Sequence, residues 1–77
     1  MRVAMHSTTK VVALVVGGQE ITARIWEGTT AGGVPCHAYV IRIAHAIGAN
    51  AHEFESELQE VAAPSPAIET IPMRMIL

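Results

Sequence analysis

Residues 10–27, with the sequence KVVALVVGGQEITARIWE, decide the fold. Residues 10–16 are almost all apolar and mostly β-branched, which is typical of a strand that is covered on both faces. Gly17 and Gly18 follow, and glycine supplies the positive φ that a tight turn needs. From Glu20 to Glu27 the side chains alternate between the two faces of an extended chain. The stretch therefore predicts an antiparallel β-hairpin.

The second strand of this hairpin divides its side chains between an apolar and a mixed face. The apolar face carries Ile21, Ala23 and Ile25, and the mixed face carries Thr22, Arg24 and Trp26. A glycine-rich loop over residues 28–33 leads to a third strand over residues 34–44, where Pro35 suggests an edge or a bulge. Matching the apolar faces of the two strands assigns a set of residues to the core. These are Ile21, Ala23, Ile25, Tyr39, Ile41 and Ile43.

Residues 50–63 change to a helical period. Asn50 is a good N-cap, and Glu53 three residues later completes a capping-box arrangement. Apolar side chains then recur at i, i+4 and i+7, on one side of the helix. They are Phe54, Leu58 and Val61. We expect this side to pack on the sheet, so that Leu58→Ala costs about 2–5 kcal/mol of stability.

These elements predict a single domain over residues 1–77 of the α+β class. The expected architecture is an antiparallel β-meander of three to four strands with one amphipathic helix packed on one face. The three-stranded antiparallel sheet occupies residues 10–44, and the helix occupies residues 50–63. Residues 1–9 lack a clean periodicity and are expected to form a mobile arm or a weak edge strand. The apolar residues 67–77 are expected to form a C-terminal strand or an arm laid on a neighbour.

Composition narrows the class of protein. The chain has 77 residues, of which 51% are hydrophobic, and its single cysteine, Cys36, excludes a disulfide framework. Domains this small are marginally stable alone, so we expect a homo-oligomer. A net charge of −2 does not suit a protein that binds duplex nucleic acid. No run approaches the roughly 18 apolar residues of a membrane helix, and a lone cysteine fits a reducing cytoplasm, so we expect a soluble cytoplasmic protein without membrane contact.

Residues that could carry catalysis or bind a metal do not form a recognisable motif. The four histidines lack the short paired spacing of zinc ligands. Cys36 and His37 are adjacent in a strand and would point to opposite faces, so they cannot act as a nucleophile and its base. The loop over residues 28–33 lacks a P-loop lysine and precedes a strand instead of a helix. We therefore expect no catalytic residue, no metal and no cofactor, and a protein that is not an enzyme.

The candidate binding residues are Arg24, Trp26 and Arg42, on the sheet face that is expected to be turned away from the helix. Two guanidinium groups beside the only tryptophan can stack on a planar ring and bind a phosphate or carboxylate. Thr29 and Thr30, in the nearby glycine-rich loop, complete the predicted ligand-binding set. In the alternative, Trp26 anchors a subunit interface and the arginines pair with acidic residues across it.

Five short segments of the chain form a further pattern: RIWEGTT (24–30), GV (33–34), RIA (42–44), APSP (63–66) and IP (71–72). In these segments the chain resembles small proteins without an assigned activity that are encoded by temperate, Mu-like transposable phages and prophages. The similarity runs from about residue 15 to residue 77. The resemblance implies a phage accessory protein of the bacterial cytoplasm. Such proteins act without catalysis, by binding a host protein or by sequestering a nucleotide signal of host defence.

Two functions follow from the sequence. In the first, a non-enzymatic homo-oligomer sequesters a small anionic ligand, such as a cyclic nucleotide, with Arg24, Trp26 and Arg42. In the second, an interaction module docks on a host or phage protein through a strand edge and its apolar tail. A ligand site needs paired arginines and a docking surface needs apolar area. The sequence contains both features and does not decide between the two functions.

Overall fold

The hairpin of residues 10–27 forms, and it extends further at both ends. In the computed structural model, which describes residues 1–77, β1 spans Val3–Val16 and β2 spans Gln19–Thr30. Gly17 and Gly18 join them with φ values of 58° and 80°. Residues 3–7 at the start of β1 pair with the end of β2, so residues 1–9 contribute to a strand, which was one of their two expected structures, and they do not form a mobile arm. Backbone hydrogen bonds to β2 hold this segment in place although it lacks an apolar period.

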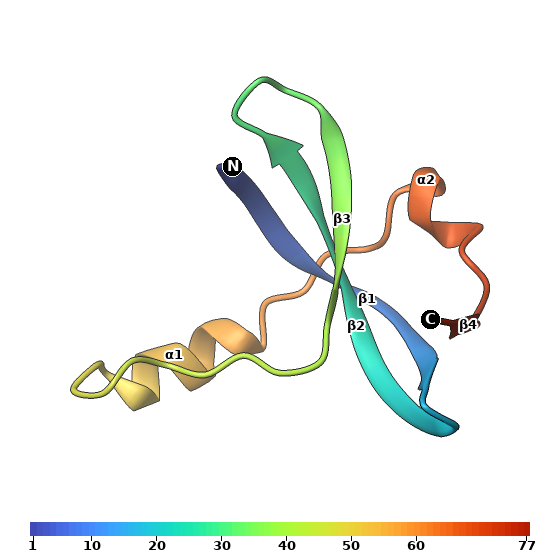
Figure 1. The fold of residues 1–77 in the computed structure, drawn as a ribbon. Coiled ribbons are helices and arrows are strands. Elements are labelled where there is room, and N and C mark those ends of the chain that lie inside the picture. Colours follow the sequence, from blue (N-terminus) through green and yellow to red (C-terminus); the bar gives the residue numbers. More distant parts are fainter.

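Two further strands complete the sheet, in the order β3-β2-β1-β4. Strand β3 spans Pro35–Val40 and is antiparallel to β2. Strand β4 spans Arg74–Ile76 and is parallel to β1. The fold is thus a small mixed domain with a four-stranded sheet, and its last strand makes it differ from a purely antiparallel meander. Figure 1 shows how strongly the strands cross and curl.

The core lies on one face of the sheet, under the C-terminal part of the chain. Its fully buried apolar side chains are Val12, Leu14, Ala23, Ile25 and Ile68. Ile68 belongs to α2, a short helix over Pro66–Glu69, and it is 2% exposed. The partly buried side chains packed around this core are Tyr39, Ile71 and Met75. The cover of the core is therefore α2 and the tail that follows it.

The expected core residues Ile41 and Ile43 are not buried. Their side chains are 57% and 45% exposed. The apolar alternation continues through them in the sequence, but pairing with β2 ends where Val40 faces Arg24. Beyond Val40 the chain leaves the sheet. Alternate side chains there no longer point toward the core-side face of the sheet, so Ile41 and Ile43 do not reach the core.

The predicted helix also packs differently from the expectation. Helix α1 spans Ala51–Leu58, and the N–H of Glu53 donates to Oδ1 of Asn50 at 3.0 Å, as a capping residue requires. However, α1 has no buried residue and projects from the sheet on the side away from α2 and β4 (Figure 1). Leu58 is 40% exposed, so its assignment to the core is wrong, and the burial on which the expected cost of Leu58→Ala depends is missing. A helical period shows which residues share a side but not which surface lies against it.

An irregular bulge of three residues in β1 pairs with the connection between the two helices. Thr8, Thr9 and Lys10 lie opposite the single residue Ile25 of β2. The side chain of Thr8 is fully buried, and its hydroxyl donates to the carbonyl of Ile25 at 2.7 Å. The outer side of the bulge pairs with Ala62, because Thr9 donates to the carbonyl of Ala62 and Ala62 donates to that of Ser7. The bulge thereby places α1 on one side of the sheet and α2 on the other.

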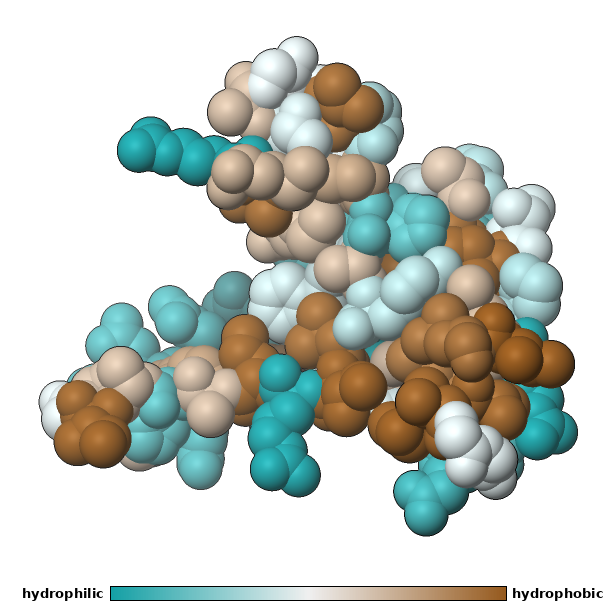
Figure 2. All heavy atoms as spheres, viewed as in Figure 1, coloured by the Kyte–Doolittle hydropathy of each residue, from teal (hydrophilic) through white to brown (hydrophobic).

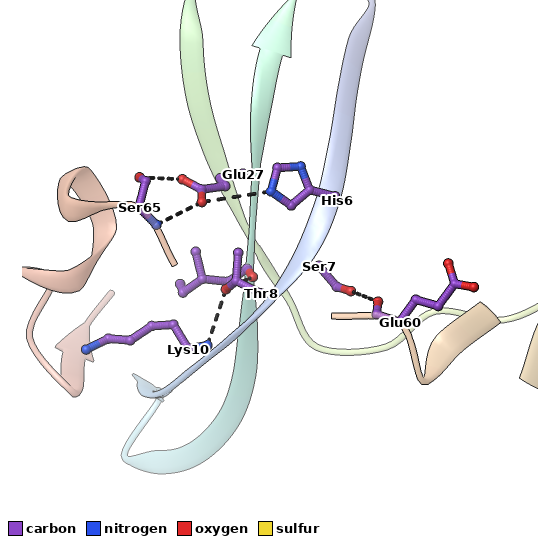
Figure 3. Close-up of polar contacts among 8 residues, drawn as sticks. His6, Ser7, Thr8, Lys10, Glu27, Glu60 and Ser65 are labelled. Atoms are coloured by element: carbon purple, nitrogen blue, oxygen red, sulfur yellow. Dashed lines mark hydrogen bonds and ion pairs between the residues drawn. The ribbon is translucent and has the colours of Figure 1, made fainter. Parts of the chain in front are cut away.

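A carboxylate on β2 fixes the start of α2. Both oxygens of Glu27 accept hydrogen bonds from Ser65, from its hydroxyl at 2.6 Å and from its N–H at 3.0 Å (Figure 3). The ring of His6 lies 3.9 Å from the same carboxylate. The hydroxyl of Ser65 is the main cause of a pKa for Glu27 below its ordinary value of 4.5, and partial burial opposes this shift. The contact joins the loop before α2 to the sheet and so positions Ile68 over the core.

The lowered pKa of Glu27 predicts a pH dependence of stability. The unfolded chain takes up a proton at Glu27 before the folded chain does, so the carboxylate stabilises the fold above pH 4.5. This contribution is lost as the pH falls through the lower, folded-state pKa. Urea unfolding between about pH 3.5 and pH 7 should therefore show a shallower acid loss of stability in Glu27→Gln than in the parent. Glu69→Gln, at an exposed position of α2, is the matched control, and equal slopes for Glu27→Gln and the parent would contradict the assignment.

Candidate functional site

A cleft of about 340 Å³ lies between the sheet and α1, on the face opposite the core. The sheet, the segment that follows β3 and the helix each supply part of its wall. The lining residues are Ser7, Arg24, Trp26 and Val40 from the sheet, Ile41, Arg42 and Ile43 from the segment, and Phe54, Glu57 and Leu58 from α1. Ligand pockets have volumes of about 300–1,000 Å³, so this cleft suits a small molecule.

The structure brings together the three residues at the centre of the sequence prediction. Arg24 and Trp26 lie on one face of β2, opposite Val40 and Ala38 of β3. Arg42 follows two residues after β3 and lines the same cleft. Trp26 is half-buried, and both arginine residues are exposed to solvent. A planar group and two cations therefore face one volume.

Thr29 and Thr30 do not belong to this cleft. They lie at the far end of β2, where Thr29 pairs with Ala4 and Thr30 pairs with Val3. The hydroxyl of Thr30 accepts a hydrogen bond from the N–H of Val34 at 3.1 Å. It thus closes the turn between β2 and β3, in which Gly33 has a φ of 86°. The glycine-rich loop forms the turn of the β2–β3 hairpin, and the structure does not bring the two threonines together with Arg24, Trp26 and Arg42.

The charges in the cleft leave its arginines available. Nη1 of Arg24 donates to the carbonyl of Thr8 at 2.8 Å, which fixes the guanidinium against the bulge and leaves its other N–H groups for a ligand. Neither Arg24 nor Arg42 takes part in the two ion pairs of the chain, which join His6 to Glu27 and Arg74 to Glu20. Glu57 is the one carboxylate in the lining, so two cations face one anion and the cleft favours an anionic ligand.

Several apolar side chains that line the cleft were expected to pack in the core. Phe54 and Leu58 form the helix side of the cleft, and Ile41 and Ile43 form part of the opposite side. The helix was expected on the other face of the sheet from Arg24 and Trp26, and this expectation is wrong. The capping and the period of α1 identify which of its residues share a side. No local signal in the sequence could have indicated their place, because the residues after Pro64 that cover the core-facing side of the sheet carry no periodicity.

The remaining polar side chains do not form a second site of this kind. No three histidine, cysteine, aspartate or glutamate side chains come close enough together to hold a metal ion. Nε2 of His37 lies 3.2 Å from the hydroxyl of Tyr39, and Cys36 is half-buried beside them in β3. The hydroxyl of Ser65 donates directly to Glu27, whose lowered pKa makes it a weak base. We interpret this pair as the structural tie of α2.

Comparison with known protein families, with curated proteins and with solved structures gives no match for this chain. The resemblance of segments such as residues 24–30 to small phage proteins therefore stays a prediction. Neither helix has the length and apolar composition needed to cross a membrane. The geometry of the cleft is consequently the main support for a functional proposal.

Proposed function

We propose that the protein is a non-enzymatic binding protein whose cleft takes a small, planar, anionic ligand. The observation that carries the proposal is that Arg24 and Trp26 of β2 line one cleft together with Arg42, which comes from the segment after β3. The indole of Trp26 offers a face on which a base can stack, and the two guanidiniums offer paired donors for a phosphate. The apolar side chains of Val40, Phe54 and Leu58 line the same cleft and would contact the ring of the ligand.

The size of the cleft favours one class of ligand within this group. Its volume of about 340 Å³ lies near the lower end of the range for ligand pockets. A cyclic mononucleotide, with one ring system and one phosphate, fits this description better than a cyclic dinucleotide enclosed by a single copy of the chain. The resemblance to phage proteins adds an expectation about biology: the ligand would be a nucleotide signal of host defence, sequestered in the bacterial cytoplasm.

The contacts of the arginines decide which variants test the proposal. Arg24 also donates to the carbonyl of Thr8, so its replacement would loosen the bulge as well as the cleft. Arg42 has no ion-pair partner in the chain and is the cleaner probe. Arg42→Lys keeps the charge but loses the planar fork, so it should weaken phosphate binding nearly as much as Arg42→Ala.

The experiment is a calorimetric titration of the protein with cyclic mono-, di- and trinucleotides. We expect heat with cyclic mononucleotides, and Trp26→Ala should reduce the binding free energy by about 1–3 kcal/mol, with a smaller loss in Trp26→Phe. Arg74→Ala is the matched control, because Arg74 lies on β4 and pairs with Glu20 outside the cleft. If Trp26→Ala and Arg42→Ala both bound cyclic mononucleotides with the same heat and affinity as the parent chain, the result would contradict the proposed site.

A second function is favoured by a different observation. The tail carries large apolar side chains that solvent reaches, namely Met73, Ile76 and Leu77. Figure 2 shows hydrophobic residues gathered at the lower right, on the side of β4 and the β1–β2 turn, whereas hydrophilic and hydrophobic residues are mixed over α1. In this reading the chain is an interaction module that docks on another protein through β4 and the tail. The absence of heat with every nucleotide in the panel would leave this reading as the better one.

A further inference from the structure

The outer edge of β3 has no partner within the chain. The strand order places β3 at one side of the sheet. At the turn, the N–H of Thr30 donates to the carbonyl of Val34 at 2.9 Å, which marks this pair as hydrogen-bonded. Hydrogen-bonded and non-bonded pairs alternate along an antiparallel ladder, and His37 and Tyr39 fall on the non-bonded pairs with β2. Their backbone N–H and C=O groups therefore point outward from the sheet.

This edge lacks the features that keep edge strands from pairing with another chain. Native proteins place charged side chains, bulges or prolines on such strands, or keep them very short. Strand β3 has six residues with the sequence PCHAYV, none of them an acid, a lysine or an arginine. Its only proline, Pro35, stands at the first position and leaves the rest of the edge open. The opposite edge strand β4 has three residues and carries Arg74.

We propose that a second copy of this chain covers the edge, with the two β3 strands antiparallel about a two-fold axis at Ala38. The outward groups of His37 then meet those of the partner's Tyr39, and the reverse pair forms across the axis. Ala38 faces the partner's Ala38, where a small side chain lets the strands approach. On the core-side face, each His37 ring stands opposite the partner's Tyr39, and such cross-strand aromatic pairs stabilise a sheet.

The surface of the single chain supports a second copy as the occupant. One chain of 8.2 kDa exposes 5725 Å², whereas a folded monomer of this mass exposes about 4,500 Å². Its radius of gyration is 13.8 Å, against about 11.5 Å for a compact domain of this length. The excess of about 1,200 Å² is comparable to the area of about 800 Å² that each partner buries in a standard interface. A symmetric contact also uses one self-complementary patch, as two-fold dimers do.

The dimer goes beyond the proposed ligand binding and does not depend on it. His37 and Tyr39 alternate with Ala38 along β3, and Ala38 shares its face with Trp26. The two side chains that would cross the interface thus lie on the opposite face from the cleft. A protein without affinity for any nucleotide could still form this dimer, and the two proposals fail separately.

A charge exchange at Ala38 tests the pairing and its register. We expect sedimentation at about 50 µM to give a mass near twice 8.2 kDa for the parent chain. Because position 38 faces itself, Ala38→Lys or Ala38→Glu alone places like charges opposite each other and should weaken the dimer roughly tenfold or more. An equimolar mixture of the two variants should restore it. A monomeric parent, variants that remain dimers, or a mixture that stays monomeric would each overturn the proposal.

Amide hydrogen exchange on the parent chain gives a test that needs no substitution. The N–H groups of His37 and Tyr39 should exchange at least about tenfold more slowly at a concentration where the chain is dimeric than after dilution to monomer. The N–H of Ala38, which faces β2, is the internal control and should change less. Equal and rapid exchange of His37 and Tyr39 at both concentrations would overturn the proposal, even if the variants at position 38 failed to fold.

Discussion

Ile68→Ala should lower the free energy of unfolding by about 2–5 kcal/mol, although Ile68 lies in a helix of only four residues. Its side chain is 2% exposed and packs with Val12, Leu14 and Ile25. Removing it leaves a cavity that the sheet cannot close, because the ladder between β1 and β2 fixes the positions of these residues. In a domain of this size the loss corresponds to a fall in Tm of roughly 10–30 °C.

The matched control is Ile47→Ala, which deletes the same atoms at a fully exposed position. Its Tm should lie within about 3 °C of the parent, because exposed substitutions rarely exceed about 0.5 kcal/mol. The comparison is made by thermal unfolding followed by circular dichroism. Similar Tm values for the two variants would show that α2 does not cover the core.

Gly28→Ala should be the second strongly destabilising change, with a cost of about 3 kcal/mol or more. Gly28 lies inside β2, and a Cβ atom there would overlap the carbonyl oxygen of Ala4 and come within 2.8 Å of the Cα of Met5. Both are backbone atoms of the neighbouring strand β1, so they cannot move aside without breaking the ladder. The strands would have to separate at this point.

Gly32→Ala provides the comparison for this substitution. Gly32 lies in the turn before β3, and the nearest atom to an added Cβ is the hydroxyl oxygen of Thr30 at 3.9 Å. Its stability should be unchanged or slightly higher, since alanine restricts the unfolded chain more than glycine does. Urea unfolding of both variants checks the prediction, and a Gly28→Ala variant as stable as Gly32→Ala would contradict the close approach of β1 and β2.

The parts of the fold that the sequence predicted depend on local rules. Alternation from Glu20 to Glu27 identified the two faces of β2, and the pair Asn50 and Glu53 identified the start of α1. The same alternation placed Arg24 and Trp26 on one face. Both residues line the cleft in the structure.

The parts that the sequence did not predict depend on contacts between distant segments. Ile68 is a single apolar residue in a short helix that begins at Pro66, so no periodicity marks it as the cover of the core. The bulge at Thr8 is made by a hydrogen bond to Ile25, seventeen residues away in the chain. Gly28 reads as a loop residue in the sequence, although its role is to let two strands approach.

The most direct test of the proposed function is a nitrogen–proton correlation spectrum of the labelled protein during titration with a 3′,5′-cyclic purine mononucleotide. The proposed function predicts saturable shifts of the indole N–H of Trp26 and of the Nε–H groups of Arg24 and Arg42, whose side chains line one cleft. The backbone amide signals of Thr30 and Ile68, which lie outside the cleft, should not shift. Shifts confined to residues outside the cleft, or no shift up to about 1 mM of the nucleotide, would contradict the proposed function.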